Sequence, residues 1–389
     1  MSKNIKGVIP KWRFPEFHLT NGWYEKKIGQ LLRIGNGRDY KHLSKGNIPV
    51  YGSGGYMLSV NDYLYDGDSV CIGRKGTINN PFFLRGKFWT VDTLFYTHSY
   101  KNCIPLFIYS VFQKINWLKY SEASGVPSLS KTTIEKINIF VPQEEEQKKI
   151  ADCLSSIDYL ISAEEKKLSL LNDYKKGWLQ KLFPSEGKTV PEWRFPEFRD
   201  SGDWENTTIE KIADYENGKA HENNIIDNGK YIVVNSKFIS TEGEIIKYTN
   251  EANLLAYKGD ILMVLSDVPN GRALSKCYLV EKDNVYTVNQ RVCRIIPEKV
   301  NSTLLFYTIN RNKYFLSFDD GVKQTNLKKN DVLSCSIVIP KEPDEQEKIA
   351  DFLSGIDELI SSQKEKIEKL KQHKIALMQG LFPAVKEVL

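Results

Sequence analysis

Basic and amide side chains in turns that contain glycine or asparagine are the residues of this chain most suited to chemistry. The candidates are Arg38, Lys41, Arg74, Lys75 and Lys131 in the first half, and Lys219, Lys237, Arg272, Gln290, Arg291, Lys323, Gln324 and Asn326 in the second. Arginine and lysine donate hydrogen bonds to guanine O6 and N7, while asparagine and glutamine pair with adenine N6 and N7. Because readout residues commonly lie on loops of a rigid sheet, the set predicts contact with double-stranded DNA. For any single member, an ordinary solvated loop charge is the alternative.

The charge of the chain, +5 in total, is distributed unevenly. Residues 1–142 hold 19 Lys and Arg against 9 Asp and Glu, whereas residues 185–340 hold 20 against 22. Each basic residue set on a phosphate releases condensed counterions, so the excess in residues 1–142 indicates a polyanionic partner. A basic surface that serves only solubility is the alternative. The acidic balance of residues 185–340 departs from the expectation for a DNA-binding domain.

Motifs for catalysis and for metal binding are incomplete. The segment Gly187-Lys188-Thr189 lacks the glycine that a P-loop needs five residues earlier, where Leu182 stands. Asn80-Pro81-Phe82-Phe83 lacks the second proline of the Asn-Pro-Pro-Tyr motif of amino-methyltransferases, so a plain turn is favoured. The six cysteines include no closely spaced pair that would indicate zinc. We therefore predict no catalytic residue, no metal site and no cofactor in this chain.

An internal repeat divides the chain into two halves. The segment 10–17, PKWRFPEF, returns as PEWRFPEF at 191–198, at an offset of 181. The segment QKKIADCLSSIDYLIS from Gln147 returns as QEKIADFLSGIDELIS from Gln346, at an offset of 199. The middle of the second copy is therefore 18 residues longer than the middle of the first. Conserved flanks around a diverged middle predict two domains of one fold with different surfaces.

Each half ends in a long amphipathic segment whose apolar residues keep a 4-3 spacing. The first seam comprises Ile150, Leu154, Ile157, Ile161, Leu168 and Leu171, and the second comprises Ile349, Leu353, Ile356, Ile360, Ile367 and Leu370. Such a narrow seam is typical of coiled coils. Polar residues interrupt both seams at matching positions, including Lys175 and Lys374, so we predict that the two helices pair with each other. Pairing with another chain and a charged, solvated helix are the alternatives.

These patterns predict an α+β protein with four segments. Two similar mixed α/β domains, residues 1–142 and 185–340, are separated by two long helices, residues 143–184 and 341–389. About forty helical residues make a rod of roughly 60 Å, which is the length of a spacer. No apolar run is long enough to cross a membrane, and the N-terminus lacks a secretory signal, so we expect a cytoplasmic protein with no membrane partner.

The order of variable domain, QKKIADCLSSID helix, second variable domain and QEKIADFLSGID helix, with the PxWRFPEF leaders, Trp23 and Trp204, resembles the DNA-specificity (S) subunit of type I restriction-modification systems over nearly the whole chain. The resemblance implies that each middle is a target-recognition domain, reading one half of a bipartite DNA site. It implies that the helices form an antiparallel coiled coil within an internal pseudo-two-fold repeat, set the half-site spacing and dock two adenine methyltransferase (M) subunits.

The same resemblance assigns no catalysis to this chain. S-adenosylmethionine, ATP and magnesium would be bound by the M subunits and by restriction/translocase (R) subunits. Two other functions are compatible with the residues. One is a single-chain restriction or methyltransferase enzyme with its own specificity domain, against which the missing nucleotide and methyl-donor motifs argue. The other is a coiled-coil interaction scaffold that never touches DNA.

Overall fold

The computed structural model describes residues 7–221 and 224–383, which form two compact units. The first unit comprises residues 1–167 and 364–389, and the second comprises residues 168–363. The two long helices, α4 (Glu144–Leu182) and α10 (Pro343–Leu381), each contribute to both units. A compact unit therefore combines one mixed domain with a part of each helix, whereas the sequence-based division set the helices apart. Among the described residues, every helix is too short or too polar to span a lipid bilayer.

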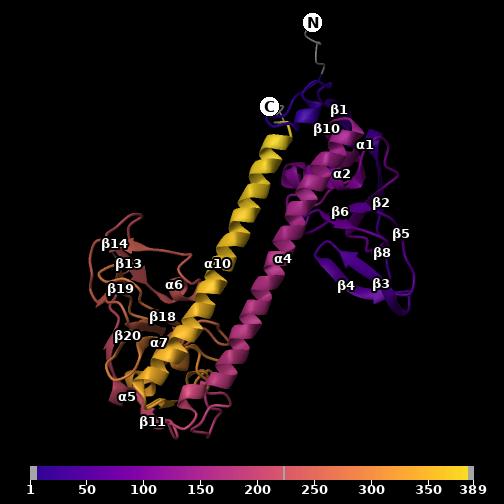
Figure 1. Cartoon of the computed structure of the whole chain (residues 1–389). Coiled ribbons are helices and arrows are strands. Elements are labelled where there is room, and N and C mark those ends of the chain that lie inside the picture. The colour runs from indigo at the N-terminus through magenta and orange to yellow at the C-terminus, as the bar shows by residue number, and fades with distance from the viewer. Residues whose placement is uncertain (1–6, 222–223, 384–389) are drawn as a thin grey trace. The chain divides into compact units, whose positions relative to one another are not determined.

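The first unit contains three sheets (Figure 1). Its strands are β1 (Tyr24–Lys27), β2 (Arg33–Asn36), β3 (Lys45–Gly52), β4 (Gly55–Val60), β5 (Tyr65–Asp66), β6 (Ser69–Gly73), β7 (Phe82–Leu84), β8 (Lys87–Thr90), β9 (Leu94–His98) and β10 (Asn138–Val141). The strand orders are β1-β10, β2-β9-β6-β7 and β4-β3-β8-β5, and β3 runs parallel to β8. Its short helices are α1 (Ile28–Leu31), α2 (Pro105–Lys114) and α3 (Lys131–Lys136).

The second unit repeats this arrangement. Its strands are β11 (Glu205–Thr208), β12 (Ala213–Asn217), β13 (Tyr231–Val234), β14 (Tyr248–Thr249), β15 (Leu255–Ala256), β16 (Ile261–Val264), β17 (Ser266–Asp267), β18 (Cys277–Leu279), β19 (Tyr286–Val288), β20 (Val292–Pro297), β21 (Thr325–Asn326) and β22 (Ser336–Ile339). Its short helices are α5 (Ile209–Ile212), α6 (Ser236–Ser240), α7 (Ser302–Ile309), α8 (Lys313–Leu316) and α9 (Lys329–Leu333). The orders β11-β22, β12-β20-β16-β18 and β14-β13-β19-β15 match those of the first unit, and β13 runs parallel to β19. The prediction of two mixed domains of one fold is confirmed.

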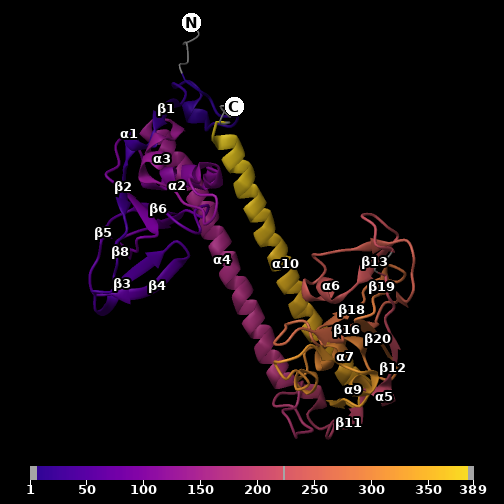
Figure 2. The same cartoon turned by 180° about the vertical axis from the view of Figure 1, so that it is seen from behind.

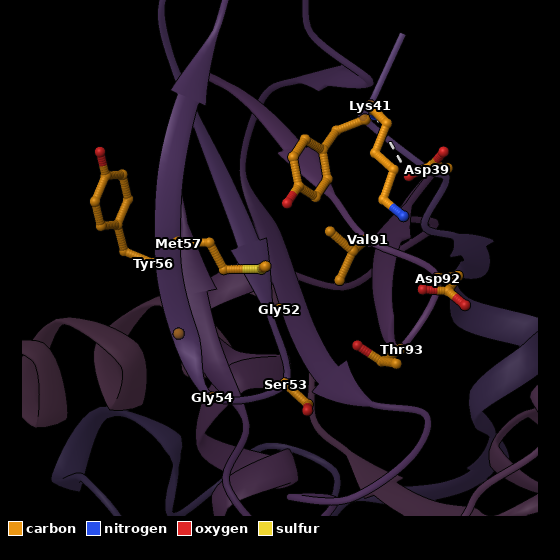
Figure 3. A pocket seen from close by; sticks show the side chains of 12 residues that line it. Asp39, Lys41, Gly52, Ser53, Gly54, Tyr56, Met57, Val91, Asp92 and Thr93 are labelled. Carbon is orange, nitrogen blue, oxygen red and sulfur yellow. Dashed lines mark hydrogen bonds between the residues drawn. The ribbon is translucent and has the colours of Figure 1, made fainter. Parts of the chain in front are cut away.

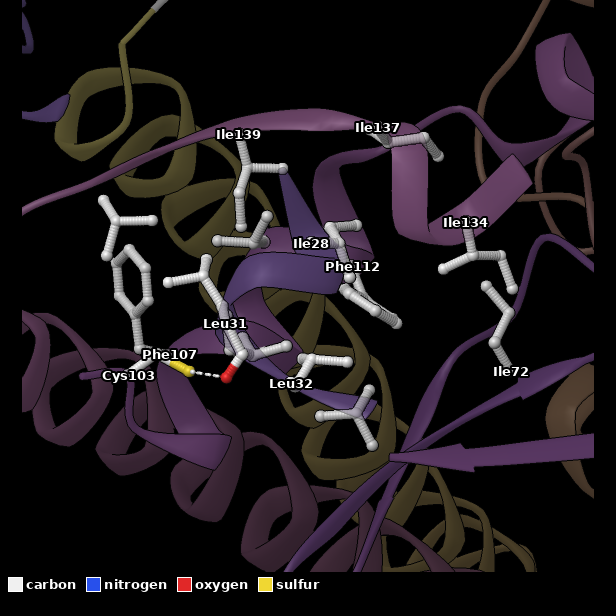
Figure 4. Packing of buried hydrophobic residues seen from close by; sticks show 14 of the residues in the cluster. Ile28, Leu31, Leu32, Ile72, Cys103, Phe107, Phe112, Ile134, Ile137 and Ile139 are labelled. Carbon is white, nitrogen blue, oxygen red and sulfur yellow. Dashed lines mark hydrogen bonds between the residues drawn. The ribbon is translucent and has the colours of Figure 1, made fainter. Parts of the chain in front are cut away.

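The central strands show why these segments form sheets. All residues of β6 and of β16 are buried, and in β16 they are continuously apolar. A strand that is covered on both faces shows such a run in place of alternation. In the first unit, Ile28, Leu31 and Leu32 pack with Phe107 and Phe112 in the core (Figure 4). The core fixes the strands whose ends carry the loops described below.

Both leaders fold onto the start of a long helix through a buried ion pair. We call Arg13, Trp23 and Glu146 the first leader cluster. The Arg13 Nε and Nη2 atoms lie 2.8 and 2.6 Å from the two carboxylate oxygens of Glu146, and Trp23 Nε1 donates to Oε1 at 3.1 Å. Both side chains of this ion pair are at most 4% exposed. Such a bidentate pair fixes the direction in which the helix leaves the domain.

The second leader cluster consists of Arg194, Trp204 and Glu345 and has the same geometry. Arg194 Nε and Nη2 lie 2.6 and 2.7 Å from the carboxylate oxygens of Glu345, and Trp204 Nε1 donates to Oε1 at 3.3 Å. The hydrogen bond that Arg194 donates to Glu345 raises the pKa of the Arg194 guanidinium. The repeated PxWRFPEF motif therefore supplies the cation for a buried carboxylate at the N-terminus of each long helix.

Within each unit, the parts of α4 and α10 run antiparallel (Figures 1 and 2). In the first unit, Lys374 Nζ lies 2.6 Å from Asp158 Oδ1, and Lys366 pairs with Glu164. In the second unit, Lys175 Nζ lies 2.5 Å from Asp357 Oδ1. The lysines that interrupt the apolar seam thus meet carboxylates of the opposite helix, which specifies the register.

The seam residues divide between two environments. Ile150 and Leu154, at the start of the first seam, belong to the core of the first mixed domain. The start of the second seam likewise belongs to the core of the second mixed domain, which includes Ile349, Leu353, Ile356 and Ile360. Farther along the first seam, Ile157 and Ile161 are buried, while Leu168 and Leu171 are partly buried against the second core. Toward the end of the second seam, Ile367 is buried and Leu370 is half-buried. The start of each seam therefore joins the helix to its domain.

Candidate nucleic-acid interface

In the first unit, the turn between β8 and β9 is the point to which the candidate loops are tied. We call Val91–Leu94 the first central turn, because the Leu94 N–H donates to the Val91 carbonyl at 2.9 Å and closes it. Just before it, the Thr90 carbonyl accepts a hydrogen bond from the Arg38 N–H at 2.8 Å. The Arg38 carbonyl in turn accepts from Trp89 Nε1 at 2.8 Å. Both peptide groups of Arg38 are thus fixed while its side chain is exposed.

The loop that carries Arg74 and Lys75 is tied to the same turn. The N–H groups of both residues donate to the Thr93 carbonyl, at 2.8 and 3.4 Å. The Arg74 guanidinium lies 5.8 Å from the ring centroid of Phe95, and the side chains of both basic residues are exposed. Three basic side chains chosen from the sequence are therefore brought together around four consecutive residues of one turn.

A pocket of about 660 Å³ lies beside this turn (Figure 3). Its lining includes Lys41 and Asp39 from one loop, Tyr56 and Gly52–Gly55 from the β3–β4 hairpin, and Asp92 from the central turn. The Asp39 carboxylate is engaged within its own loop, because its Oδ1 accepts a hydrogen bond from the Lys41 N–H at 3.3 Å. Cationic, aromatic and carboxylate groups therefore line one hollow, which suits it to a heterocyclic base edge.

Lys131 is less closely associated with the central turn. It begins α3, and within the described chain no hydrogen bond joins it to Val91–Leu94. Its charge acts instead on His98 at the far end of β9. Burial, together with Lys131 and Arg33, lowers the pKa of that histidine.

The second unit has an equivalent turn. We call Asn289–Val292 the second central turn, because the Val292 N–H donates to the Asn289 carbonyl at 2.9 Å. The Lys219 N–H donates to the Val288 carbonyl at 3.0 Å, in the manner of Arg38. The Leu265 N–H donates to the Arg291 carbonyl at 2.9 Å, in the manner of Arg74. Lys219, Gln290 and Arg291 are all exposed on this shared scaffold.

Two further loops of the second unit approach its central turn. Asn326 pairs with Ser266 in the short β17–β21 ladder, and Gln324 Nε2 donates to Ser266 Oγ at 2.7 Å. These loops carry the exposed Arg272 and Lys323. Lys237 lies apart on α6, where it is exposed, and in the described residues no hydrogen bond links it to the turn. Hydrogen bonds therefore tie Lys219 and Arg291 to the turn and set Gln324 and Asn326 beside Ser266, the residue after Leu265. In the described chain no hydrogen bond links Arg272 or Lys323 to the turn.

A glycine faces each central turn and lets the backbone of its own loop pass close to the backbone of the turn. An added Cβ on Gly37 would lie 1.8 Å from the Val91 carbonyl oxygen, and one on Gly218 would lie 2.0 Å from that of Asn289. These two glycines are related by the 181-residue offset of the leaders. The same offset relates Arg38 to Lys219, one residue later.

Asp92 and Tyr56 are site residues that the sequence analysis missed. Both line the pocket, and both are exposed. The sequence signal for Asp92 is its place in a short turn, two residues beyond the end of β8.

The described part of the chain contains no candidate metal site, because no three His, Cys, Asp or Glu side chains lie close enough together there to hold an ion. Of the six free cysteines, five are buried and Cys153 is half-buried. Burial raises the pKa of the Cys103 thiol to about 11 and that of Cys335 to about 12. Thiols with such pKa values remain protonated near neutral pH, which makes them poor metal ligands.

Comparison with known proteins identifies the family that shares this double architecture. The profile described as the type I restriction modification DNA specificity domain matches twice, at residues 20–173 and 201–372. The chain belongs to this family. The family's matches include one mixed domain and part of one long helix each, so the family repeat and the structural repeat coincide.

Relatives of the family's type cover nearly the whole chain. The type I restriction enzyme MjaVIII specificity subunit of Methanocaldococcus jannaschii is 28% identical, over 95% of this chain and 88% of the relative. A crystal structure of the S subunit of a type I restriction-modification system from M. genitalium has a TM-score of 0.70 at 14% identity, covering 97% of this chain and all of that one. A chain from a structure of complex assembly and conformational transition of the type I R-M system has a TM-score of 0.52 at 14% identity, over 96% and 100%. The resemblance predicted from the sequence is confirmed.

Proposed function

We propose that this chain is the DNA-recognition subunit of a type I restriction-modification complex, and that each unit reads one half of a bipartite site. The observation that carries the proposal is the repeated central turn, which holds exposed basic side chains in both units, Arg38 and Arg74 around the first turn and Lys219 and Arg291 around the second. Loops around one turn present such groups together to a groove edge, whereas scattered surface charges would not.

In this proposal the paired helices set the distance between the half-sites and dock two M subunits. Each helix is 39 residues long and continues from one unit into the other. Catalysis belongs to the partners: adenine methylation with S-adenosylmethionine to the M subunits, and ATP- and magnesium-dependent translocation and cleavage to the R subunits. The chain itself supplies recognition and assembly.

Exchange of one domain tests the proposal. The chain is expressed with its M subunits after residues 205–339 have been replaced by the corresponding residues of a homologue, and methylated sites are mapped by single-molecule sequencing. We expect one half-site to change while the other stays the same. The reciprocal exchange of residues 24–141 is the matched control and should change only the other half-site. A hybrid in which both half-sites change would contradict independent reading.

Insertion into the helices tests their role as a spacer. Four residues are added after Lys167 and four after Gln363, at the boundary between the units, so that the pairs Lys366–Glu164 and Lys175–Asp357 stay intact. At about 1.5 Å per residue the insertions add about 6 Å, or roughly two base pairs at 3.4 Å each. Four residues are close to one turn, so the apolar seam keeps its face. Methylation of sites with the original gap would show that the helices do not set the spacing.

A further inference from the structure

The two central turns present different side chains from one backbone geometry. In the first unit the positions after the first turn residue are Asp92 and Thr93, and in the second unit they are Gln290 and Arg291. The strand registers equate these positions, because Arg74 donates to Thr93 as Leu265 donates to Arg291. A carboxylate therefore occupies in one domain the place that an amide occupies in the other.

The Asp92 carboxylate has no structural task in the described chain. Other aspartates of the first unit do have tasks: Asp39 accepts the Lys41 N–H at 3.3 Å, and Asp68 pairs with Arg85 at 2.9 Å. Among the described residues, neither a hydrogen bond nor an ion pair reaches the exposed side chain of Asp92. The turn itself is closed by the backbone bond from Leu94 to Val91, so the carboxylate is not needed to form it.

When a nucleic acid is bound to this surface, a carboxylate at position 92 is costly unless it meets a hydrogen-bond donor. Arg38, Arg74 and Lys75 are tied to the same turn, and Lys41 lines the same pocket. On a surface built to meet phosphates, a negative charge repels the backbone of the nucleic acid. A carboxylate is favourable on such a surface where it points at base edges and accepts a hydrogen bond from an exocyclic amino group.

We infer that Asp92 is a specificity-determining residue of the first unit and that it accepts a hydrogen bond from the N4 amino group of cytosine in the major groove. The inference rests on the proposed function. Cytosine is favoured over adenine because adenine places the N7 acceptor beside its N6 amino group, and N7 repels a carboxylate. Gln290, at the equivalent position, has both an acceptor and a donor and suits adenine N6 and N7.

The test is the substitution Asp92→Asn in the assembled complex with its M subunits. Asparagine keeps the shape but adds the donor that adenine N7 requires. We expect one position of one half-site to change from cytosine to adenine, and the affinity for the original site to fall on the order of 10- to 100-fold. Asp92→Ala should relax the same position without a new preference. Methylome mapping and duplex-binding titrations with each base at that position measure both effects.

The control is Asp66→Asn. Asp66 is also exposed, but it pairs in register with Lys87 at the opposite end of β8 from the central turn. This variant should leave the motif and the affinity unchanged. Retention of the second half-site and of the thermal unfolding midpoint shows that the Asp92 variants are folded.

Three outcomes overturn the inference. The first is an unchanged motif and affinity in Asp92→Asn, and the second is an equal change of affinity on all sequences, which indicates a general effect and not the reading of one base. The third is a change from adenine, and not from cytosine, at the affected position. A wild-type complex without any sequence preference would defeat the proposed function itself, whereas a wild-type preference that Asp92→Asn leaves intact defeats only this inference.

Discussion

Glycine shapes the loops around the first central turn, whereas aspartate shapes those around the second. The segments 52–55 and 73–76 of the first unit contain five glycines. In the second unit, Asp267 Oδ2 accepts the N–H groups of Ala273 and Leu274 at 2.6 and 3.1 Å. Asp319 accepts the N–H groups of Asn270 and Gly321, both at 3.0 Å. Glycine permits the backbone angles that a tight loop requires, and aspartate accepts hydrogen bonds from the loop's N–H groups.

This difference explains the charge balance of the two units. Many acidic residues of the second domain are engaged within it: Asp320 caps the loop that carries Lys323, and Asp260 lies 2.6 Å from Arg294. Hydrogen bonds from the backbone of Lys323 and Val322 lower the pKa of Asp320. A net charge near zero over residues 185–340 therefore coexists with exposed basic side chains around its central turn. Net charge along a segment is a poor measure of the charge on one of its faces.

Disruption of a leader cluster should produce the largest loss of stability, and the loss should be equal in the two units. Arg13→Ala or Arg194→Ala would strand a carboxylate that is 1% exposed, which should lower the free energy of unfolding by about 3–5 kcal/mol. Urea titration of each variant measures the loss. The exposed pairs of Lys149 and Lys348 with leader glutamates serve as controls, and their alanine variants should lose less than about 1 kcal/mol. A large loss in only one unit would show that the clusters are not equivalent.

Substitution of the glycine that faces a central turn should impair the unit that contains it and leave the other unit unaffected. Gly37→Ala and Gly218→Ala each place a methyl group within 2.0 Å of a backbone oxygen, so the turn must shift. We expect a loss of roughly 3 kcal/mol in stability and loss of reading by the affected half-site alone. Methylome mapping and thermal unfolding measure the two effects. Gly54→Ala is the control, because no atom lies within 4 Å of its added Cβ. Loss of both half-sites from one substitution would break the comparison.

Removal of the basic groups should weaken the first unit in a salt-dependent way. In the triple variant Arg38→Ala, Arg74→Ala and Lys75→Ala, each lost phosphate contact should lower the slope of log affinity against log salt by about one. A lost base-reading arginine should cost about 1–3 kcal/mol and relax one position of the motif. Duplex binding by the assembled complex at several salt concentrations provides the measurement. Wild-type affinity and slope in this variant would remove these residues from the interface.

The aspartate that holds the second unit's loops should give the smallest effect. Asp319→Ala removes acceptors for Asn270 and Gly321, and should reduce affinity for the second half-site by about 1 kcal/mol. The first half-site should be unaffected, because Asp319 and the loops that it holds belong to the second unit. Titration with duplexes altered in one half-site at a time distinguishes the two. An equal effect on both half-sites would argue against separate shaping of the loops.

The repeat and the long helices were predictable because their signals are local. A seam with a 4-3 spacing needs only neighbouring residues to be recognised, and a duplicated motif needs only a second copy. The leader clusters were not predictable in the same way. Arg13 and Glu146 lie 133 residues apart, and nothing near either one identifies its partner.

The candidate site was predictable by residue type but not by position. Turn chemistry selected Arg38, Arg74 and Arg291, which the structure places around the central turns. The same chemistry selected Lys131 and Lys237, which are exposed but lie outside those contacts. Asp92 was missed because its role depends on the charge of its neighbours in space and not on its own type.

By itself, the sequence determined the duplication, the helical seams and the polar composition of the loops, since each depends on short-range spacing. Only the tertiary structure decided which loops share a surface. Gly37 meets the first central turn although it is far from it in the sequence, because its N–H donates to the Leu94 carbonyl at 3.2 Å. Backbone hydrogen bonds between the neighbouring strands hold these segments together. Those bonds depend on strand register, and a shift of one residue would turn every side chain to the other face. The equivalence of Asp92 and Gln290 follows from that register, because the offset of 181 that relates the leaders does not relate the two turns, which are 198 residues apart.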